Sequence, residues 1–296
     1  MDFFGRLEAQ WRDKGTILCV GLDPRLEGNE TPEDLYRKSM AIVRATADYA
    51  ACFKPNIAFY EAWGAAGYDA LISLVHDIPD GIPVILDAKR GDIGPTAEAY
   101  AQACFGTIGA DAVTLSPYMG RDSVDPFLAW PDKAVFLLAR TSNPRAGIFQ
   151  DIDAGGTPFY AAVASECASW SPRVGLVVAG NDADGMRVVR HAAPDAWFLA
   201  PGIGAQGGDI GEAWTAGARH DGLGVLPVAA RAVAEAADPA EAARSLAETM
   251  RRVHDETMAS DTATGRIRGR GYDRIALLKR RIMNGLVDTG FFRSGT

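Results

Sequence analysis

Charged side chains gather in one short stretch of this chain. The segment VILDAKRGDIGPTAEAY runs from Val84 to Tyr100 and places Asp87, Lys89 and Asp92 at and beyond the end of an apolar run. Side chains two residues apart on a strand share a face, so we expect Asp87 and Lys89 to point the same way. Asp92 would follow in the loop. The set is either catalytic or a simple salt-bridge ladder at a strand end.

A second lysine has the same kind of setting. Lys54 lies inside the apolar run ACFKPNIAF, where an ammonium group needs a partner, and Asp87 on the next strand is the best candidate. The two lysines and two aspartates would then alternate in charge, so that all four could stay ionised although partly buried. The simpler alternative for Lys54 is a buried stem with the ammonium group in solvent.

The segment PGIGAQGGD (201–209) and the nearby Arg231 suggest an anion site. Glycines such as Gly202 and Gly207 let backbone N–H groups approach an anion closely. Arg231 would add a bidentate donor, and Gln206 a neutral amide. These features favour a phosphate site over plain turns.

A weaker signal comes from RTSNP (140–144). Ser142 and Asn143 offer donors and acceptors that suit the edge of a heterocycle. By itself this motif does not identify a ligand.

Eight short apolar runs must position these side chains. They are near-continuous, which indicates strands buried on both faces in a parallel sheet. Helical patterns lie between them, and eight strand–helix units predict a (β/α)8 TIM barrel, whose active site lies at the carboxyl ends of the strands. A doubly wound open sheet is the alternative, but VGLDPRLEG lacks the glycine motif usual after its first strand. The runs are 16–23, 51–59, 83–89, 111–117, 134–141, 174–180, 196–202 and 222–228.

Polar residues end or follow nearly all of these runs, as an active site at the carboxyl ends requires. They are Asp23, Lys54, Asp87, Lys89, Ser116, Thr141, Ser142, Asn181, Gln206 and Arg231.

Composition excludes several classes of protein. A net charge of −8 over 296 residues argues against general nucleic-acid binding. The four cysteines and four histidines form no metal-binding pattern, and we expect no metal and no cofactor. We expect that the first residues are not a signal peptide, and no run of roughly 18 apolar residues would span a membrane. A cytoplasmic protein is expected, with a barrel over 1–258 and a linker plus C-terminal helix over 259–296.

Seven segments, in order along the chain, resemble the orotidine 5′-phosphate decarboxylase family, in particular its longer bacterial subgroup with DAKRGDI. The resemblance covers roughly residues 10–255. The segments are GLDPR, FKPNIAFYE, LDAKRGDIGPTAEAYA, SPYMGRDS, TSNP, PGIGAQGGD and VLPVAAR.

The resemblance implies a reaction. The substrate would be orotidine 5′-monophosphate and the products uridine 5′-monophosphate and CO2, the last step of de novo UMP biosynthesis, without metal or cofactor. Lys54, Asp87, Lys89 and Asp92 match the family's catalytic array, with Lys89 as the proton donor to C6.

The resemblance also implies a homodimer with shared active sites. Asp92 would reach into the neighbour's site, together with Thr96. The family's ribose-contacting aspartate matches Asp23. Its pyrimidine-contacting serine matches Ser142, and its phosphate-binding pair matches Gln206 and Arg231.

Three other functions are open to the same residues. A sugar-phosphate decarboxylase or aldol-type synthase would use Mg²⁺, which Lys54 would repel. A Schiff-base aldolase would need an uncharged Lys89, whereas we expect two flanking aspartates to favour its charged form. A catalytically silent nucleotide-phosphate binder would not need the intact array.

The tail IALLKRRIMNGLVDTGFFRSGT also resembles the opening helix of an orotate phosphoribosyltransferase, so the chain could include the start of a fused segment.

Overall fold

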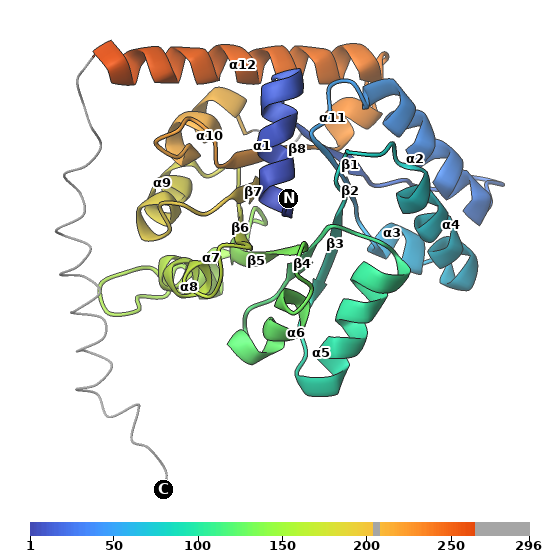
Figure 1. Ribbon diagram of the computed structural model, residues 1–296, viewed down its shortest axis with the longest axis horizontal. Helices are drawn as coiled ribbons and strands as arrows, with labels where there is room; N and C mark the ends of the chain where they lie inside the picture. The colour runs from blue at the N-terminus through green and yellow to red at the C-terminus, as the bar shows by residue number, and fades with distance from the viewer. Residues whose placement is uncertain (204–207, 264–296) are drawn as a thin grey trace, which may run out of the picture.

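The computed structural model describes residues 1–203 and 208–263, and in it eight parallel strands form a barrel surrounded by helices (Figure 1). The strand order is β2-β1-β8-β7-β6-β5-β4-β3. Parallel bridges from Phe53 to Val84 and from Asn56 to Asp87 join β2 to β3 and close the ring. The TIM barrel predicted from the sequence is confirmed, and the open sheet is excluded.

Each strand falls on one of the eight apolar runs, although the third and the eighth strands each end one residue beyond their run. The strands are β1 (Cys19–Leu22), β2 (Cys52–Pro55), β3 (Ile85–Arg90), β4 (Ala112–Leu115), β5 (Ala134–Arg140), β6 (Val174–Val178), β7 (Phe198–Ala200) and β8 (Val225–Ala229). Every residue of β1, β2, β4, β6, β7 and β8 is buried, because each strand packs both on the barrel interior and on the surrounding helices.

Helices precede, connect and follow the strands. They are α1 (Phe3–Lys14), α2 (Pro32–Thr46), α3 (Ala58–Glu61), α4 (Gly64–Asp77), α5 (Gly94–Ala101), α6 (Asp125–Leu128), α7 (Gly147–Gln150), α8 (Phe159–Ala168), α9 (Ala183–Ala192), α10 (Ile210–Gly217), α11 (Arg231–Ala234) and α12 (Pro239–Ala263). A π-helical turn, η1 (Gln102–Thr107), continues α5, and a short 3₁₀ turn, η2 (Arg121–Ser123), precedes α6.

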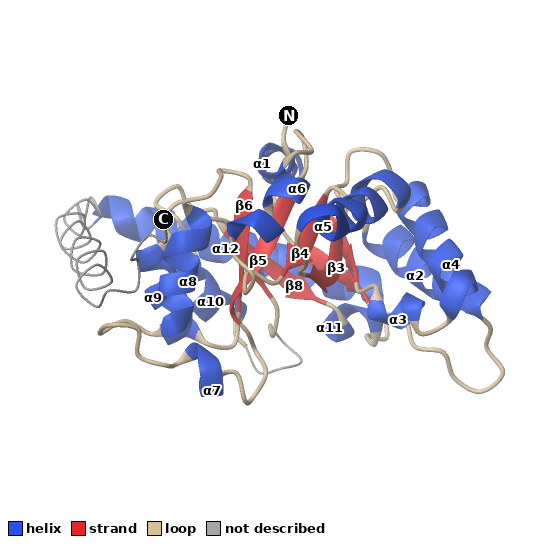
Figure 2. Cartoon of the chain, turned by 90° about the horizontal axis from the view of Figure 1, so that it is seen from below, coloured by secondary structure: helices blue, strands red, loops and turns tan. Residues whose placement is uncertain are grey.

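Helix α1 closes the end of the barrel at which the strands begin. The Asp2 carboxylate caps its first turn by accepting from the Gly5 amide at 2.8 Å, which satisfies a free N–H group. Phe4 stacks on Trp197 with ring centroids 6.0 Å apart, and Phe3 meets Phe136 edge to face. In Figure 2, α1 lies at one end of the strands, and α3, α7 and α11 lie at the other. The open end is therefore the end at which the strands finish.

The last helix extends beyond the expected domain boundary. We expected a polar linker from residue 259, but α12 continues to Ala263. Ala243, Met250 and Val253 are buried along it, and α12 packs against α10, α2 and α11. The rest of the expected tail lies outside the described residues. Among the helices of the described residues, none is long and apolar enough to cross a membrane.

Candidate active site

A bulge in β3 shapes the centre of the site. Leu86 pairs with Val113, but the next pair joins Arg90 to Leu115, so β3 carries two more residues than β4 over this interval. Lys89, the last residue of the bulge before Arg90, has a φ of 47°, a left-handed conformation that is uncommon outside glycine. The bulge thus lets the end of β3 turn its side chains in a way that a regular strand would not.

Two lysines contact the carboxylate of Asp87, each at a different oxygen. Lys54 Nζ lies 3.0 Å from Asp87 Oδ2, and Lys89 Nζ lies 2.5 Å from Asp87 Oδ1. The Thr114 hydroxyl donates to Oδ1 at 3.0 Å. The side chains of Lys54 and Asp87 are only 7% and 12% exposed, whereas that of Lys89 is 50% exposed. The structure therefore forms a buried ion pair with a second, half-exposed ammonium group beside it.

The charges of these groups stabilise one another. Burial by itself raises the pKa of Asp87, but the ammonium groups of Lys54 and Lys89 outweigh it and hold that pKa well below the usual range. Burial likewise lowers the pKa of Lys54, and the carboxylates of Asp87 and Asp23 more than offset it, so this pKa lies above its usual value. Both members of the pair are therefore ionised at neutral pH.

The fourth member of the expected array lies apart from the other three. Asp92 follows β3 in the loop before α5, and its Oδ1 accepts from the Ile93 amide at 2.8 Å. Within the described ranges, no hydrogen bond or ion pair joins Asp92 to Lys89. Thr96, in the first turn of α5, is exposed. The structure of one chain thus combines Lys54, Asp87 and Lys89, but not Asp92 or Thr96.

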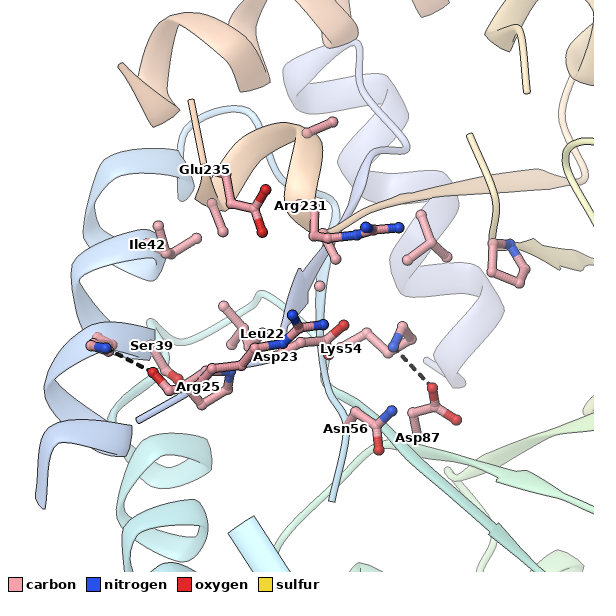
Figure 3. Close-up of a pocket in the computed structure, with 18 of the residues that line it drawn as sticks. Leu22, Asp23, Arg25, Ser39, Ile42, Lys54, Asn56, Asp87, Arg231 and Glu235 are labelled. Atoms are coloured by element: carbon pink, nitrogen blue, oxygen red, sulfur yellow. Dashed lines mark hydrogen bonds and ion pairs between the residues drawn. The ribbon is translucent and has the colours of Figure 1, made fainter. Parts of the chain in front are cut away.

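A cavity of about 610 Å³ extends from this cluster towards α11. Figure 3 shows Asp23, Lys54 and Asp87 on one side of it and Arg231 with Glu235 on the other. Asp23 follows β1, and burial raises its pKa, although Lys54 opposes that shift. In the part of the chain that the structure describes, its buried Oδ1 has no hydrogen-bond partner. This oxygen is an acceptor suited to a ligand hydroxyl.

The far side of the cavity has the features of an anion site. Arg231 begins α11 with an exposed side chain, and Gly202 lines the cavity with a φ of 98°. The Gly208 amide donates to the Gly202 carbonyl at 3.1 Å, so the two ends of this loop lie together. A side chain at Gly208 would place its Cβ 2.7 Å from that carbonyl oxygen, too close for any residue but glycine. The expected Gln206 and Gly207 lie outside the described residues.

The residues expected to contact a heterocycle are not among those that line the cavity. Ser142 and Asn143 follow β5, and the Thr141 hydroxyl donates to Asn143 Oδ1 at 2.7 Å. The Gln150 side chain bonds both the amide and the hydroxyl of Thr141, which folds α7 back onto the end of β5.

Two residues near the site were not predicted from the sequence. Thr114 bonds Asp87, and Asn56 lines the cavity and forms a bridge with Asp87. A polar threonine inside the buried run DAVTLSP was a usable signal for Thr114, because a buried hydroxyl needs a partner. Among the described residues, no group of three or more His, Cys, Asp or Glu side chains could hold a metal ion.

This (β/α)8 barrel carries a Lys–Asp–Lys cluster and an anion-suited loop at the carboxyl ends of its strands. That is where the active sites of barrel enzymes lie. Residues 16–246 match the family described as orotidine 5′-phosphate decarboxylase / HUMPS. The chain belongs to this family.

Individual relatives agree with this assignment. The chain is 47% identical over 266 residues to the orotidine 5′-phosphate decarboxylase of Roseiflexus castenholzii, covering 85% of this chain and 96% of the relative. It is 42% identical, with a TM-score of 0.81, to the structure of Leishmania donovani OMP decarboxylase, covering 86% of this chain and 99% of the other. It is also 44% identical, with a TM-score of 0.83, to Leishmania donovani UMP synthase, covering 86% of this chain but 57% of that one.

Proposed function

We propose that this protein converts orotidine 5′-monophosphate to uridine 5′-monophosphate and CO2, the last step of de novo UMP biosynthesis. The observation that carries the proposal is the Asp87 carboxylate, held ionised between Lys54 and Lys89 at the edge of a cavity that reaches Arg231. Family membership and relatives named as orotidine 5′-phosphate decarboxylases support it.

The cluster suggests how the carbon–carbon bond breaks. A substrate carboxylate placed near Asp87 would repel it, since two negative charges interact strongly where water is scarce. When the bond from C6 to the carboxylate breaks, CO2 leaves and its bonding electron pair stays on C6. The repulsion is then relieved, and the adjacent ammonium groups stabilise the new negative charge.

Lys89 is the proposed proton donor. Its ammonium group is half exposed and lies at the edge of the buried pair, so it can approach a substrate atom while Lys54 keeps Asp87 ionised. Transfer of one proton from Lys89 Nζ to C6 completes uridine 5′-monophosphate, and solvent then reprotonates the amine.

The remaining predicted residues would bind parts of the substrate remote from C6. Asp23 would accept from the ribose, Ser142 and Asn143 would contact the pyrimidine, and Arg231 with Gly202, Gln206 and Gly207 would hold the phosphate. Binding energy gained there offsets the cost of placing the substrate carboxylate beside Asp87.

A spectrophotometric assay with orotidine 5′-monophosphate in the presence of a chelator tests the assignment. We expect full activity without added metal. We also expect Lys89→Ala to abolish turnover while it still binds uridine 5′-monophosphate. Normal turnover by Lys89→Ala, or a strict need for Mg²⁺, would contradict the proposed chemistry.

We further propose a homodimer in which Asp92 and Thr96 complete the partner's site. Asp92 lies in the loop after β3, and exposed apolar side chains occur on this loop and on the loop after β4, namely Ile93, Tyr118 and Met119. Tyr118 is 89% exposed, an unusual position for so large an apolar surface in a monomer. A second copy of this chain is the occupant that would bury these side chains and bring Asp92 to a Lys89.

Mixing two inactive variants tests this sharing. In a dimer of Lys89→Ala with Asp92→Ala subunits, one site would combine an intact Lys89 with an intact Asp92. Random exchange of subunits should therefore restore about a quarter of wild-type activity. Absence of any recovery, in samples that light scattering shows to be dimeric, would mean that each site is built from one chain.

Two further parts of the assignment are proposals. All four cysteines are buried and free, which supports the expected reducing, cytoplasmic setting. The resemblance of the tail to orotate phosphoribosyltransferase supports a fused segment of that kind after α12. Truncation after Ala263 leaves α12 intact, and we expect it to retain decarboxylation; a large loss would assign the tail to the barrel.

A further inference from the structure

We propose that Thr114 is a positioning residue that holds Asp87 and Lys89 in their reactive arrangement. The proposal rests on the decarboxylase function given above and concerns how its reactive groups are held. Thr114 lies on β4, one strand away from the groups it would position, and is 1% exposed.

The hydroxyl group of Thr114 makes three hydrogen bonds to one segment of β3. It accepts from the backbone amides of Ala88 and Lys89, each at 3.0 Å, and donates to Asp87 Oδ1 at 3.0 Å. A hydroxyl has one proton and two lone pairs, so these bonds use its full capacity. With both lone pairs engaged by N–H donors, its proton is directed at the Asp87 carboxylate.

These bonds replace the strand ladder where it is interrupted. Between the pairs Leu86–Val113 and Arg90–Leu115, the bulged residues of β3 oppose Thr114 alone. The Thr114 side chain therefore accepts from two part-buried amides in the interrupted stretch of the ladder, where an unpaired N–H group is costly. It also stabilises the left-handed backbone of Lys89, whose φ is 47°.

The consequence for chemistry is a fixed distance between two reactive groups. Lys89 Nζ and the Thr114 hydroxyl bond the same oxygen, Asp87 Oδ1, while Lys54 bonds the other. Because Thr114 holds both the backbone of Lys89 and the carboxylate of Asp87, it couples the position of the proton donor to that of its neighbouring charge. Loss of the hydroxyl would free the bulge to relax and move Lys89 Nζ.

A pair of substitutions separates the hydroxyl from the shape of the side chain. Thr114→Val keeps the branched shape and removes all three bonds, whereas Thr114→Ser keeps the hydroxyl. We expect Thr114→Val to lower kcat about 100-fold, as misplacement of a catalytic group by ~1 Å does. We expect the kcat of Thr114→Ser to stay within about threefold of the wild-type value. The KM of both variants should change little, because the residues proposed to bind the phosphate are unchanged. Activity is expressed per site that binds uridine 5′-monophosphate, so that unfolded protein does not count.

Thr16→Val is the matched control. Thr16 is also 1% exposed, and its hydroxyl donates to the Tyr49 carbonyl and accepts from the Leu18 amide, but it lies at the closed end of the barrel. The Thr16→Val variant should lose stability but keep the wild-type kcat per site that binds uridine 5′-monophosphate. Equal losses of kcat in Thr16→Val and Thr114→Val would reduce Thr114 to a structural role and overturn the proposal, as would wild-type kcat in Thr114→Val.

Crystal structures of the two Thr114 variants give a readout that does not depend on activity. We expect Thr114→Val to lose the positive φ at Lys89 and the contact between Lys89 Nζ and Asp87, and Thr114→Ser to keep both. If wild-type protein failed to turn over orotidine 5′-monophosphate, the proposed function would fall, while this structural comparison would still decide the role of Thr114. An unchanged bulge in Thr114→Val would refute it.

Discussion

Replacing Lys54 by methionine tests the electrostatic account of the site. Lys54→Met keeps much of the side-chain volume and removes a cation whose side chain is 7% exposed and 3.0 Å from a carboxylate that is 12% exposed. Removing one partner of a buried ion pair costs about 3–5 kcal/mol, because the other charge remains buried. Asp87 keeps Lys89 and Thr114, so we expect the lower end of this range, about 3 kcal/mol of unfolding free energy at pH 7.

The pH dependence gives a second, independent signature. In the wild type the depressed pKa of Asp87 stabilises the fold above the unfolded value of about 3.9, and this is lost only as the pH falls through the folded value. The raised pKa of Lys54 stabilises the fold below about 10.4 and is lost only as the pH rises through the folded value. Between pH 5 and 8 both contributions are therefore constant.

The variant should behave differently over the same range. Without Lys54, the pKa of Asp23, already raised by burial, rises further, and that of Asp87 rises with it. As the pH falls, the folded variant then takes up a proton that the unfolded chain does not. The loss of unfolding free energy relative to wild type therefore becomes smaller, by at most about 1.4 kcal/mol per pH unit for each proton.

Urea unfolding at fixed protein concentration, followed by circular dichroism at pH 8, 7, 6 and 5, measures both effects. Lys133→Met is the control, because its pair with Asp111 is looser, at 3.3 Å, and Asp111 keeps Arg6. We expect this control to lose about 1 kcal/mol or less, independently of pH. The reasoning would be refuted if Lys54→Met lost less than about 1 kcal/mol of unfolding free energy, or if its loss were constant from pH 7 to pH 5.

Two further predictions concern the loops. Gly202→Ala forces a side chain onto a backbone with a φ of 98°, at a strain of about 1–3 kcal/mol. It should raise KM for orotidine 5′-monophosphate more than it lowers kcat, and an unchanged KM would separate Gly202 from the phosphate. Arg140→Met removes bonds from the end of β5 to Asp151 at 2.5 Å and Asp182 at 2.8 Å. We expect faster limited proteolysis within 141–158, mapped by mass spectrometry, and a wild-type digestion pattern would contradict this role of Arg140.

The sequence predicted the barrel because its strands are buried on both faces. Each apolar run is near-continuous and ends in polar residues, and that pattern depends only on local composition. The role of α1 was not predicted, because nothing within MDFFGRLEAQWRDKG indicates that Phe3 and Phe4 pack beneath Phe136 and Trp197. Packing partners so distant in sequence leave no periodic signal.

The sequence correctly predicted that Asp87 and Lys89 lie together, but the structure shows a different physical reason for it. Regular strand alternation was the argument, but the segment is bulged and Lys89 has a left-handed backbone. The two-residue spacing was still informative, because Asp87 and Lys89 both lie towards the end of the same strand. The bulge itself depends on the hydroxyl of Thr114, which comes from a neighbouring strand, so no inspection of the stretch VILDAKRGDIGPTAEAY alone could find it.

The residues of the site divide by the elements that hold them. Lys54, Asp87, Lys89 and Thr114 belong to the adjacent strands β2, β3 and β4, and ion pairs or hydrogen bonds join them. Of the groups proposed for the phosphate and pyrimidine, those that the structure describes come instead from loops and from the start of a short helix. Groups on packed strands keep their geometry more closely than groups on loops. Substitutions in the loops should therefore change mainly the binding energy of the remote parts of the substrate, whereas substitutions on β2, β3 and β4 should change mainly the chemical step.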